Sequence, residues 1–359
     1  MVRPPLPAAD LAHVLTHTAS LWPALAGERL FITGGTGFFG TWLLESIVHA
    51  RQQLQLDIRA TVLSRTPERF LAQHPHLAGQ EALDWWRGDI KDFDFPGQTH
   101  RHIIHAATET YVREQPEAPV TSFDAIVQGT RRVLDFALYT GARQVLLTSS
   151  GAIYGPQPLD RIHVPEQHPG APDCADPTAV YGEGKRTAEL LCALYHQQHG
   201  LDVKIARCFA FVGPQLPLDK HFAIGNFMND VLQGRDIAIQ GDGTPLRSYL
   251  HAADLVIWLL TILLRGAPLR PYNVGSDQAL SIADLARQVA TSLPGRERQV
   301  SIARTPEPGK PPARYVPDVT RARSELGLEV RIPLADAIQR TLAWHLREGP
   351  AVPPCGKDQ

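Results

Sequence analysis

The segment that most constrains the fold is a glycine-rich turn between an apolar run and a helical run. It reads Thr33-Gly34-Gly35-Thr36-Gly37-Phe38-Phe39-Gly40, and it follows the apolar run 30–33. In a strand–turn–helix of this spacing, the first glycine permits the turn, the second lets the backbone approach a pyrophosphate, and the third lets helix and strand pack closely. The alternative is a glycine turn without a ligand. The strand–helix context favours a dinucleotide site, with these candidate cofactor-binding residues: Gly34, Thr36, Gly37, Phe38, Phe39 and Gly40.

The pattern after this turn alternates short apolar runs with helical stretches. The predicted strands are 30–33, 58–63, 103–105, 144–148 and 203–207. Such alternation is typical of an α/β fold, a Rossmann-type doubly wound parallel sheet with helices on both faces. Residues 10–25 predict a helix outside the main fold, and the apolar stretch 255–264, too short to span a bilayer, predicts a buried helix.

The end of the second predicted strand indicates which dinucleotide is bound. A carboxylate there accepts from the adenosine ribose 2′-hydroxyl, whereas an arginine accommodates a 2′-phosphate. This chain has Ser64 and Arg65 at that point, so NADP is favoured, with NAD as the alternative. Further along, Asp89 and Ile90 follow Gly88, where the aspartate either accepts from the adenine amino group or only stabilises a turn.

Tyr181 and Lys185 are four residues apart and lie on one face if the segment is helical. A neighbouring cation favours the phenolate form, so we expect Lys185 to let Tyr181 exchange a proton near neutral pH. Ser150 follows an apolar strand about 30 residues upstream, at the edge where ligands bind in open α/β sheets. We therefore predict a catalytic set of Ser150, Tyr181 and Lys185, in which Lys185 also holds the nicotinamide ribose.

Together these motifs resemble the extended short-chain dehydrogenases that act on nucleotide sugars, the NAD-dependent epimerase/dehydratase family. The resemblance covers residues 29–345 and also includes these motifs: Gly88-Asp89, His105-Ala106-Ala107, Tyr154-Gly155, Gly213-Pro214, Arg247-Ser248-Tyr249-Leu250-His251 and Tyr272-Asn273-Val274-Gly275. It implies that Ala106 and Ala107 line the cofactor site. It also implies a nucleotide-diphosphate sugar as substrate, and a homodimer formed through the helices containing 129–139 and 181–196. The implied substrate-binding residues are Ser150, Gly151, Tyr181, Asn226, Arg247 and Arg314.

The resemblance also implies a division of the chain. We expect an N-terminal helical extension at 1–28, a dinucleotide-binding domain at 29–211 plus 249–275, and a smaller C-terminal substrate-binding lobe at 212–248 plus 276–359.

The chain departs from the family pattern beside the candidate catalytic serine. The 4,6-dehydratases have Asp-Glu after the catalytic hydroxyl and the decarboxylases have a glutamate there, but this chain has Gly151-Ala152. Two family asparagines are replaced by Ile126 and Ala210, and a late arginine by Pro308, with Lys310 or Arg314 as possible substitutes. Dehydration and decarboxylation are therefore disfavoured, unless Glu166 or Asp173 in the proline-rich loop 155–177 supplies the carboxylate.

The favoured reaction is hydride transfer at C4 of a nucleotide-diphospho-hexose by an NADPH-dependent 4-ketoreductase. A 4-epimerase with tightly held NAD uses the same three residues and is the alternative. A catalytically silent dinucleotide sensor is a third possibility, although such a protein has no need of an intact catalytic set.

Composition excludes other classes of protein. A net charge of −2 argues against nucleic acid and anionic membranes as partners. The four cysteines and fifteen histidines lack metal-ligand spacing, so no metal is expected. No export signal is evident at the N-terminus, and a cytoplasmic location is expected.

Overall fold

A large parallel sheet forms the centre of the molecule. The computed structural model describes residues 2–108, 119–220 and 222–347. Seven parallel strands of this described part form the sheet in the order β11-β6-β5-β4-β1-β2-β3. Their bounds are β1 Arg29–Thr33, β2 Arg59–Ser64, β3 Leu83–Arg87, β4 His102–His105, β5 Gln144–Ser150, β6 Val203–Cys208 and β11 Pro271–Val274. The strand order reverses beside β1, between β4 and β2, which is where doubly wound folds bind ligands at the carboxyl edge. The predicted fold class is confirmed.

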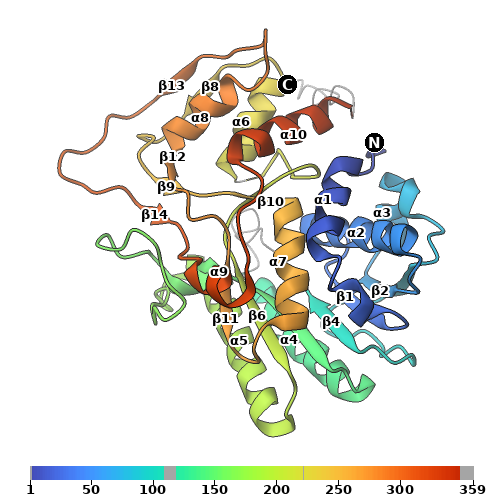
Figure 1. Ribbon diagram of the computed structural model, residues 1–359. Coiled ribbons are helices and arrows are strands. Elements are labelled where there is room, and N and C mark those ends of the chain that lie inside the picture. Colours follow the sequence, from blue (N-terminus) through green and yellow to red (C-terminus); the bar gives the residue numbers. More distant parts are fainter. Residues whose placement is uncertain (1, 109–118, 221, 348–359) are drawn as a thin grey trace, which may run out of the picture.

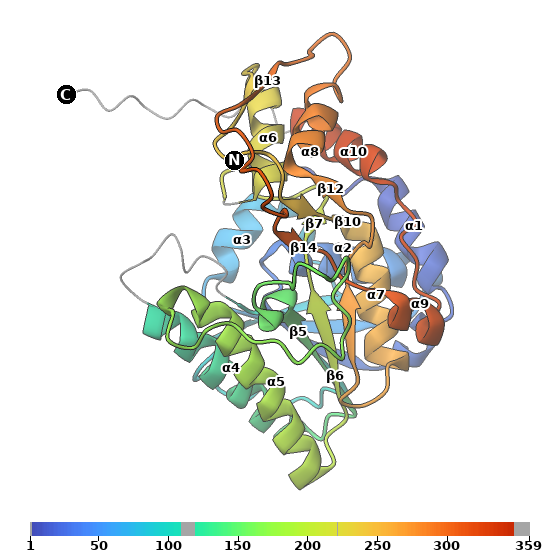
Figure 2. The same cartoon turned by 90° about the vertical axis from the view of Figure 1, so that its left-hand side faces the viewer.

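Successive side chains of the strands enter two separate cores, one on each face of the sheet. In β1, Leu30 and Ile32 belong to the core under α2 and α7, whereas Phe31 belongs to the core under α4 and α5. Leu146 and Leu147 of β5 divide in the same way. This period of two is the one that a sheet covered on both faces requires. The covering helices are α2 Phe38–Leu54, α4 Pro119–Thr140, α5 Val180–His199 and α7 Ala252–Arg265 (Figures 1 and 2). α7 is almost entirely buried, as its sequence predicted.

The N-terminal helix is integrated into the main fold, so the expectation that it lies outside is wrong. α1 (Ala8–Thr18) and the short helix η1 (Trp22–Leu25) place Val14, Trp22 and Leu25 in the same core as α2 and α7. His13 Nε2 lies 3.0 Å from the buried Asp254 carboxylate of α7. A weak apolar periodicity predicted the helix but could not show which surface it covers.

A smaller part stands above the carboxyl edge of the sheet (Figure 1). Its strands pair in two small sheets, β12-β9-β14 and β13-β8, while β7 and β10 pair with each other below them. The bounds are α6 Ala223–Leu232, β8 Ile237–Ile239, β9 Leu246–Arg247, β12 Leu280–Ser281, α8 Ile282–Ala290, β13 Val300–Ile302, β14 Arg314–Tyr315, α10 Leu334–Arg347, β7 Phe211–Val212 and β10 Leu250–His251.

The remaining helices lie beside the large sheet. α3 (Pro67–Gln73) follows β2, and α9 (Thr320–Leu326) lies against β11. We propose the dinucleotide-binding domain and the substrate-binding lobe expected from the sequence, with the N-terminal segment 2–28 and α9 both assigned to the larger part.

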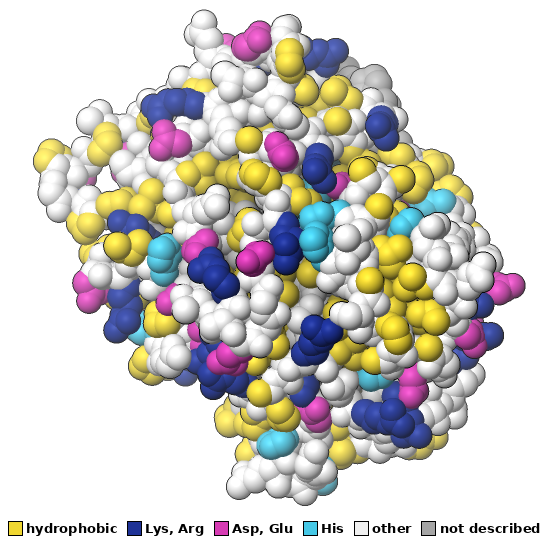
Figure 3. Space-filling model, viewed as in Figure 1, with side chains coloured by type: hydrophobic (Ala, Val, Ile, Leu, Met, Phe, Trp, Pro, Cys, Tyr) yellow, Lys and Arg dark blue, Asp and Glu magenta, His cyan; other side chains and the backbone are white. Residues whose placement is uncertain are grey.

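The surface carries mixed charges. On the face shown in Figure 3, basic and acidic side chains are interspersed rather than segregated. Among the described residues, no helix is long and apolar enough to cross a bilayer.

Candidate active site

The glycine turn connects β1 to α2 and forms a cradle that only glycine can build. Gly34 has a φ of 73°, and a Cβ on it would lie 2.5 Å from the backbone of Ala106. A Cβ on Gly40 would lie 2.3 Å from the Gly34 carbonyl oxygen. Gly37 is the N-cap of α2 and supplies no side-chain cap, so the first amides of the helix remain available to an anion. The cradle therefore fits a dinucleotide pyrophosphate.

The other residues predicted for this part of the cofactor site surround the cradle. Thr36 is exposed at the turn, and Phe38 and Phe39 are half-buried at the start of α2. Ala106 and Ala107 follow β4 directly opposite, where the Ala107 amide donates to Thr33 Oγ1 at 3.1 Å. This contact holds the ends of two neighbouring strands together.

Arg87 joins Ser64 and Arg65 at the ends of β2 and β3. Ser64 is in register with Arg87, and a guanidinium nitrogen of Arg87 donates to the Arg65 carbonyl oxygen at 3.4 Å. Arg87 also forms an ion pair with Glu68 at 2.7 Å, and its side chain is 65% exposed. Two arginines therefore stand at this edge of the sheet, where the sequence predicted one.

Asp89 and Ile90 follow β3 at the same edge of the sheet. Both residues are half-buried, and Asp89 Oδ1 accepts from the Lys91 amide at 3.1 Å. Ile90 packs against the helix backbone at Gly129 of α4. The aspartate thus stabilises a turn, with its second oxygen, Oδ2, as the candidate acceptor for an adenine amino group.

Ser150 and Tyr181 meet at the carboxyl edge of the sheet. Ser150 ends β5, and its hydroxyl accepts from the Ala152 amide at 3.1 Å. Tyr181 stands in the first turn of α5, and its phenol lies beside the Ser150 hydroxyl. The phenol of Tyr315 on β14 also lies beside Ser150. A serine hydroxyl therefore lies between two phenols, one from each part of the molecule.

Lys185 is buried one helical turn below Tyr181. Its Nζ donates to the Thr148 carbonyl oxygen at 2.8 Å, and burial lowers the pKa of Lys185 to about 8. Next to it, His105 bridges Thr33 and Thr130 through its two ring nitrogens, at 2.8 and 3.1 Å. Burial, followed by the charge of Lys185, lowers the pKa of His105 to about 3, so this imidazole is neutral. The ammonium is thus held by the Thr148 carbonyl oxygen, while the Glu189 carboxylate acts on it only through its charge.

The expectation that Lys185 lowers the pKa of Tyr181 is not met in this structure. Burial raises the pKa of Tyr181 to about 12, and the opposing effect comes from the neighbouring Ser150 hydroxyl. Desolvation penalises the phenolate more than its neighbours stabilise it. Tyr181 is therefore protonated at neutral pH and ready to donate.

Gly151 faces a space that two aromatic rings already occupy. A Cβ at this position would lie 2.7 Å from the Phe209 ring and 2.8 Å from the Tyr315 hydroxyl. No side chain fits there without displacement of both rings. At the position where the dehydratases carry an aspartate, this chain therefore lacks the carboxylate, and packing leaves no space for one.

Neither carboxylate of the proline-rich loop replaces the missing one. Glu166 is buried away from Ser150, where its Oε1 accepts from the Asn273 amide at 2.9 Å and its Oε2 lies 3.8 Å from Arg321. Asp173 is exposed and accepts from the Ala175 amide at 2.9 Å. Both acids stabilise local structure.

The predicted substrate residues are not equally well placed. Arg247 on β9 is in register with Tyr315 on β14 and therefore shares its face of the small sheet. Arg314 is in register with Leu246 and points to the opposite face. Asn226 is exposed on α6, and Lys310 is an exposed partner of Glu307. Arg247 is thus the predicted substrate residue of this lobe that lies nearest the catalytic set.

Several family positions serve packing in this chain. Ile126 fits against Gly184 of α5, and the Ala210 carbonyl accepts from the Leu250 amide. His251 is buried beside Trp42 and caps α7 through its Nδ1, so it packs rather than lines the site. In the described part of the chain, no group of three His, Cys, Asp or Glu residues could hold a metal ion.

Sequence reasoning missed three residues of the site, namely Phe209, Tyr315 and Arg87. Tyr315 belongs to a strand of only two residues in the expected loop 305–317, and its partner strand is about 70 positions away. Arg87 directly precedes Gly88-Asp89 and could have been found from that motif.

Comparison with known proteins identifies the class to which this fold and site belong. The chain matches the NAD-dependent epimerase/dehydratase family over residues 30–275. It therefore belongs to that family and is an enzyme of the extended short-chain dehydrogenase/reductase type.

Individual relatives of this chain catalyse different reactions. UDP-glucuronic acid decarboxylase 5 of Arabidopsis thaliana is 28% identical over 318 residues, covering 86% of this chain and 87% of the relative. The structure of the dTDP-glucose 4,6-dehydratase DesIV of Streptomyces venezuelae, with NAD bound, has 26% identity and a TM-score of 0.74, covering 89% of this chain and 97% of that one. A UDP-glucose 4-epimerase of Thermotoga maritima shares the fold, with 19% identity, a TM-score of 0.74 and coverage of 89% and 99%.

Proposed function

We propose that this enzyme reduces the C4 ketone of a nucleotide-diphosphate sugar with NADPH. The observation that carries the proposal is the site around Ser150. It contains a hydroxyl, a protonated phenol and a buried ammonium, while packing closes the position of the dehydratase acid. The relatives, which act on UDP- and dTDP-sugars, support the substrate class.

Ser150, Tyr181 and Lys185 have separate roles in the proposed carbonyl reduction. Bound NADPH supplies the hydride. Ser150 donates a hydrogen bond to the C4 oxygen and orients it, while Tyr181 gives its proton to that oxygen as negative charge develops. The pKa of about 12 for Tyr181 suits this direction, because the reaction consumes a proton. The Lys185 ammonium would hold the hydroxyl groups of the nicotinamide ribose.

Arg65 and Arg87 support NADP as the cofactor. A ribose 2′-phosphate carries up to two negative charges and accepts forked hydrogen bonds from guanidinium groups. Arg65 follows Ser64 at the end of β2, Arg87 ends β3 beside it, and no carboxylate occupies the Ser64 position.

The 4-epimerase remains the alternative, since it needs the same three residues. Its first half-reaction oxidises C4 and requires Tyr181 to accept a proton. A protonated phenol with a raised pKa opposes that step, which favours the reductase.

Because no acidic side chain fits at Gly151, we predict that the enzyme does not catalyse dehydration. Elimination of water across C5 and C6 requires an acid and a base within reach of those atoms. We expect no 4-keto-6-deoxy product from dTDP-, CDP-, GDP- or UDP-hexoses, even with added NAD. Mass spectrometry would detect it. A product that forms in proportion to enzyme and disappears in Tyr181→Phe would contradict the proposal.

The pKa of Lys185 predicts how the reduction depends on pH. The free-enzyme ammonium has a pKa of about 8, so its charge is present below that pH and is lost above it. We expect kcat/KM, which reports groups of the free enzyme, to fall as pH rises through about 8. Tyr181, with a pKa of about 12, cannot cause this decline. A Lys185→Gln variant should retain a slow rate without this step, and a wild-type profile flat to pH 10 would argue against the assignment.

We further propose that the enzyme is a homodimer that pairs α4 and α5 with their copies. These helices contact each other and expose apolar side chains near their C-terminal ends, among them Tyr139 (63% exposed), Leu190 (60%) and Leu194 (40%). A second copy would remove this surface from water.

Substitution on α5 tests the dimer. Leu190→Asp together with Leu194→Asp should give a monomer at micromolar concentration, measured by light scattering during size-exclusion chromatography. Ile302→Asp, which alters an equally exposed side chain on β13 (40%), should leave the dimer intact. A monomeric wild-type protein would refute the proposed interface.

A further inference from the structure

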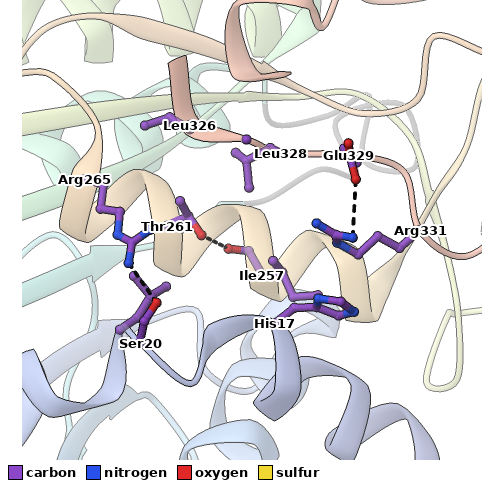
Figure 4. A pocket seen from close by; sticks show the side chains of 11 residues that line it. His17, Ser20, Ile257, Thr261, Arg265, Leu326, Leu328, Glu329 and Arg331 are labelled. Atoms are coloured by element: carbon purple, nitrogen blue, oxygen red, sulfur yellow. Dashed lines mark hydrogen bonds and ion pairs between the residues drawn. The ribbon is translucent and has the colours of Figure 1, made fainter. Parts of the chain in front are cut away.

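A cavity lies between α1, α7 and the segment that follows α9 (Figure 4). It measures about 140 Å³. Arg265, one of its lining residues, ends α7 just before the amino end of β11, whereas Ser150 stands at the carboxyl end of β5. In a parallel sheet these ends lie on opposite edges. The cavity is therefore separate from the active site.

Basic groups dominate the rim of this cavity. His17, Arg265 and Arg331 line it together with a single acid, Glu329. Arg265 donates to the Ser20 hydroxyl at 2.8 Å, which directs the guanidinium toward α1. Arg331 lies 3.3 Å from Glu329, whose side chain is 58% exposed, so this ion pair is worth little against a competing anion. Figure 4 shows His17, Arg265 and Arg331 on three different segments.

The positive charge of the cavity comes from Arg265 and Arg331. His17 contributes ring nitrogens rather than a charge, because its pKa is lowered, first by burial and then by the charge of Arg331. Below these groups the floor consists of the buried side chains of Leu21, Ile257 and Leu328. Thr261 completes the floor, and its hydroxyl is already bonded to the Ile257 carbonyl oxygen. The hydrogen-bond donors that remain for a ligand therefore lie at the rim of the cavity.

We propose that this cavity binds a small phosphate dianion, either free phosphate or the phosphate group of a small monoester. The tetrahedral oxygens of a phosphate accept hydrogen bonds from several directions, and guanidinium forks suit them. The volume corresponds to about five water molecules, enough for one phosphate group but far too small for a dinucleotide or a nucleotide sugar. The bound anion would bridge α1, α7 and the segment after α9, and so stabilise the docking of the N-terminal helix.

Thermal unfolding of the full chain tests this site. The probes are inorganic phosphate and glycerol 3-phosphate, each compared with chloride at equal ionic strength, and NADP is present at saturation to fill the cofactor cleft. We expect saturating phosphate to raise the unfolding midpoint by about 2 °C or more. Arg265→Gln and Arg331→Gln should each weaken binding about tenfold or more in titration calorimetry. Arg287→Gln, an exposed arginine paired with Asp284, is the matched control and should change nothing.

The outcomes separate the possible sources and sites. Tighter binding of glycerol 3-phosphate than of phosphate would identify a monoester as the ligand, and the reverse would identify free phosphate. Two results would overturn the proposal. Phosphate could raise the unfolding midpoint no more than chloride does, or the rise with phosphate could persist in both Arg265→Gln and Arg331→Gln. If Arg65→Ala abolished the rise in the unfolding midpoint, the anion would bind at the cofactor site instead.

Discussion

Tyr181→Phe should lower turnover by about 100- to 10,000-fold, the range that general acid catalysis usually supplies. The substitution removes only the hydroxyl that lies beside Ser150 and leaves the ring in the first turn of α5. The KM for the sugar should change much less than kcat, because the proton is transferred only in the transition state. Steady-state kinetics with NADPH and a 4-keto nucleotide sugar measures both.

A matched control distinguishes this loss from general damage. Tyr195→Phe removes a phenol oxygen from the same helix, where it donates to Asp135 outside the site, and should retain near-normal turnover. NADPH binding, followed by fluorescence, should be similar in all three proteins. Near-normal turnover of Tyr181→Phe would mean that another group donates the proton, and Tyr315, the second phenol on Ser150, would be the first candidate.

Arg65→Ala should weaken NADP binding by about 10- to 100-fold while changing NAD binding little. A charge-assisted hydrogen bond to the 2′-phosphate is worth about 1.5–3 kcal/mol, and NAD lacks that phosphate. Arg87→Ala should act in the same direction, because Arg87 ends the neighbouring strand in register with Ser64. Titration calorimetry with both cofactors gives the ratio of affinities.

Arg69→Ala, an exposed arginine on α3 one turn beyond Arg65, is the control and should not alter that ratio. If Arg65→Ala lost equal affinity for NADP and NAD, the argument for NADP would fail, and an enzyme that holds NAD would be favoured.

Local patterns predicted five of the seven strands that form the large sheet in the described part of the chain, but not β3 or β11. Apolar runs separated by helical stretches identified β1, β2, β4, β5 and β6 within two residues at each end. β3 was missed because Trp85 and Trp86 are only half-buried and charged residues flank them. The docking of α1 could not be predicted, since it depends on contacts such as that of His13 with Asp254, 241 positions away.

The candidate site was predictable where one short segment carries it. The glycine turn and the Tyr181–Lys185 pair each lie within eight residues, so spacing alone identifies them. Tyr315 and Phe209 reach Gly151 from distant segments, and no local pattern indicates that contact. The raised pKa of Tyr181 could not be predicted either, because it results from burial under the assembled lobes rather than from the neighbouring lysine.

The most direct test of the account is a single incubation of the purified enzyme with a 4-keto nucleotide sugar and NADPH. Cofactor absorbance and product identity are recorded together. We expect the loss of one NADPH for each sugar reduced, with a C4 alcohol as the product. An inversion at C4 of ordinary nucleotide hexoses without net loss of NADPH, in the absence of any reduction of the 4-keto sugar, would contradict it and identify an epimerase.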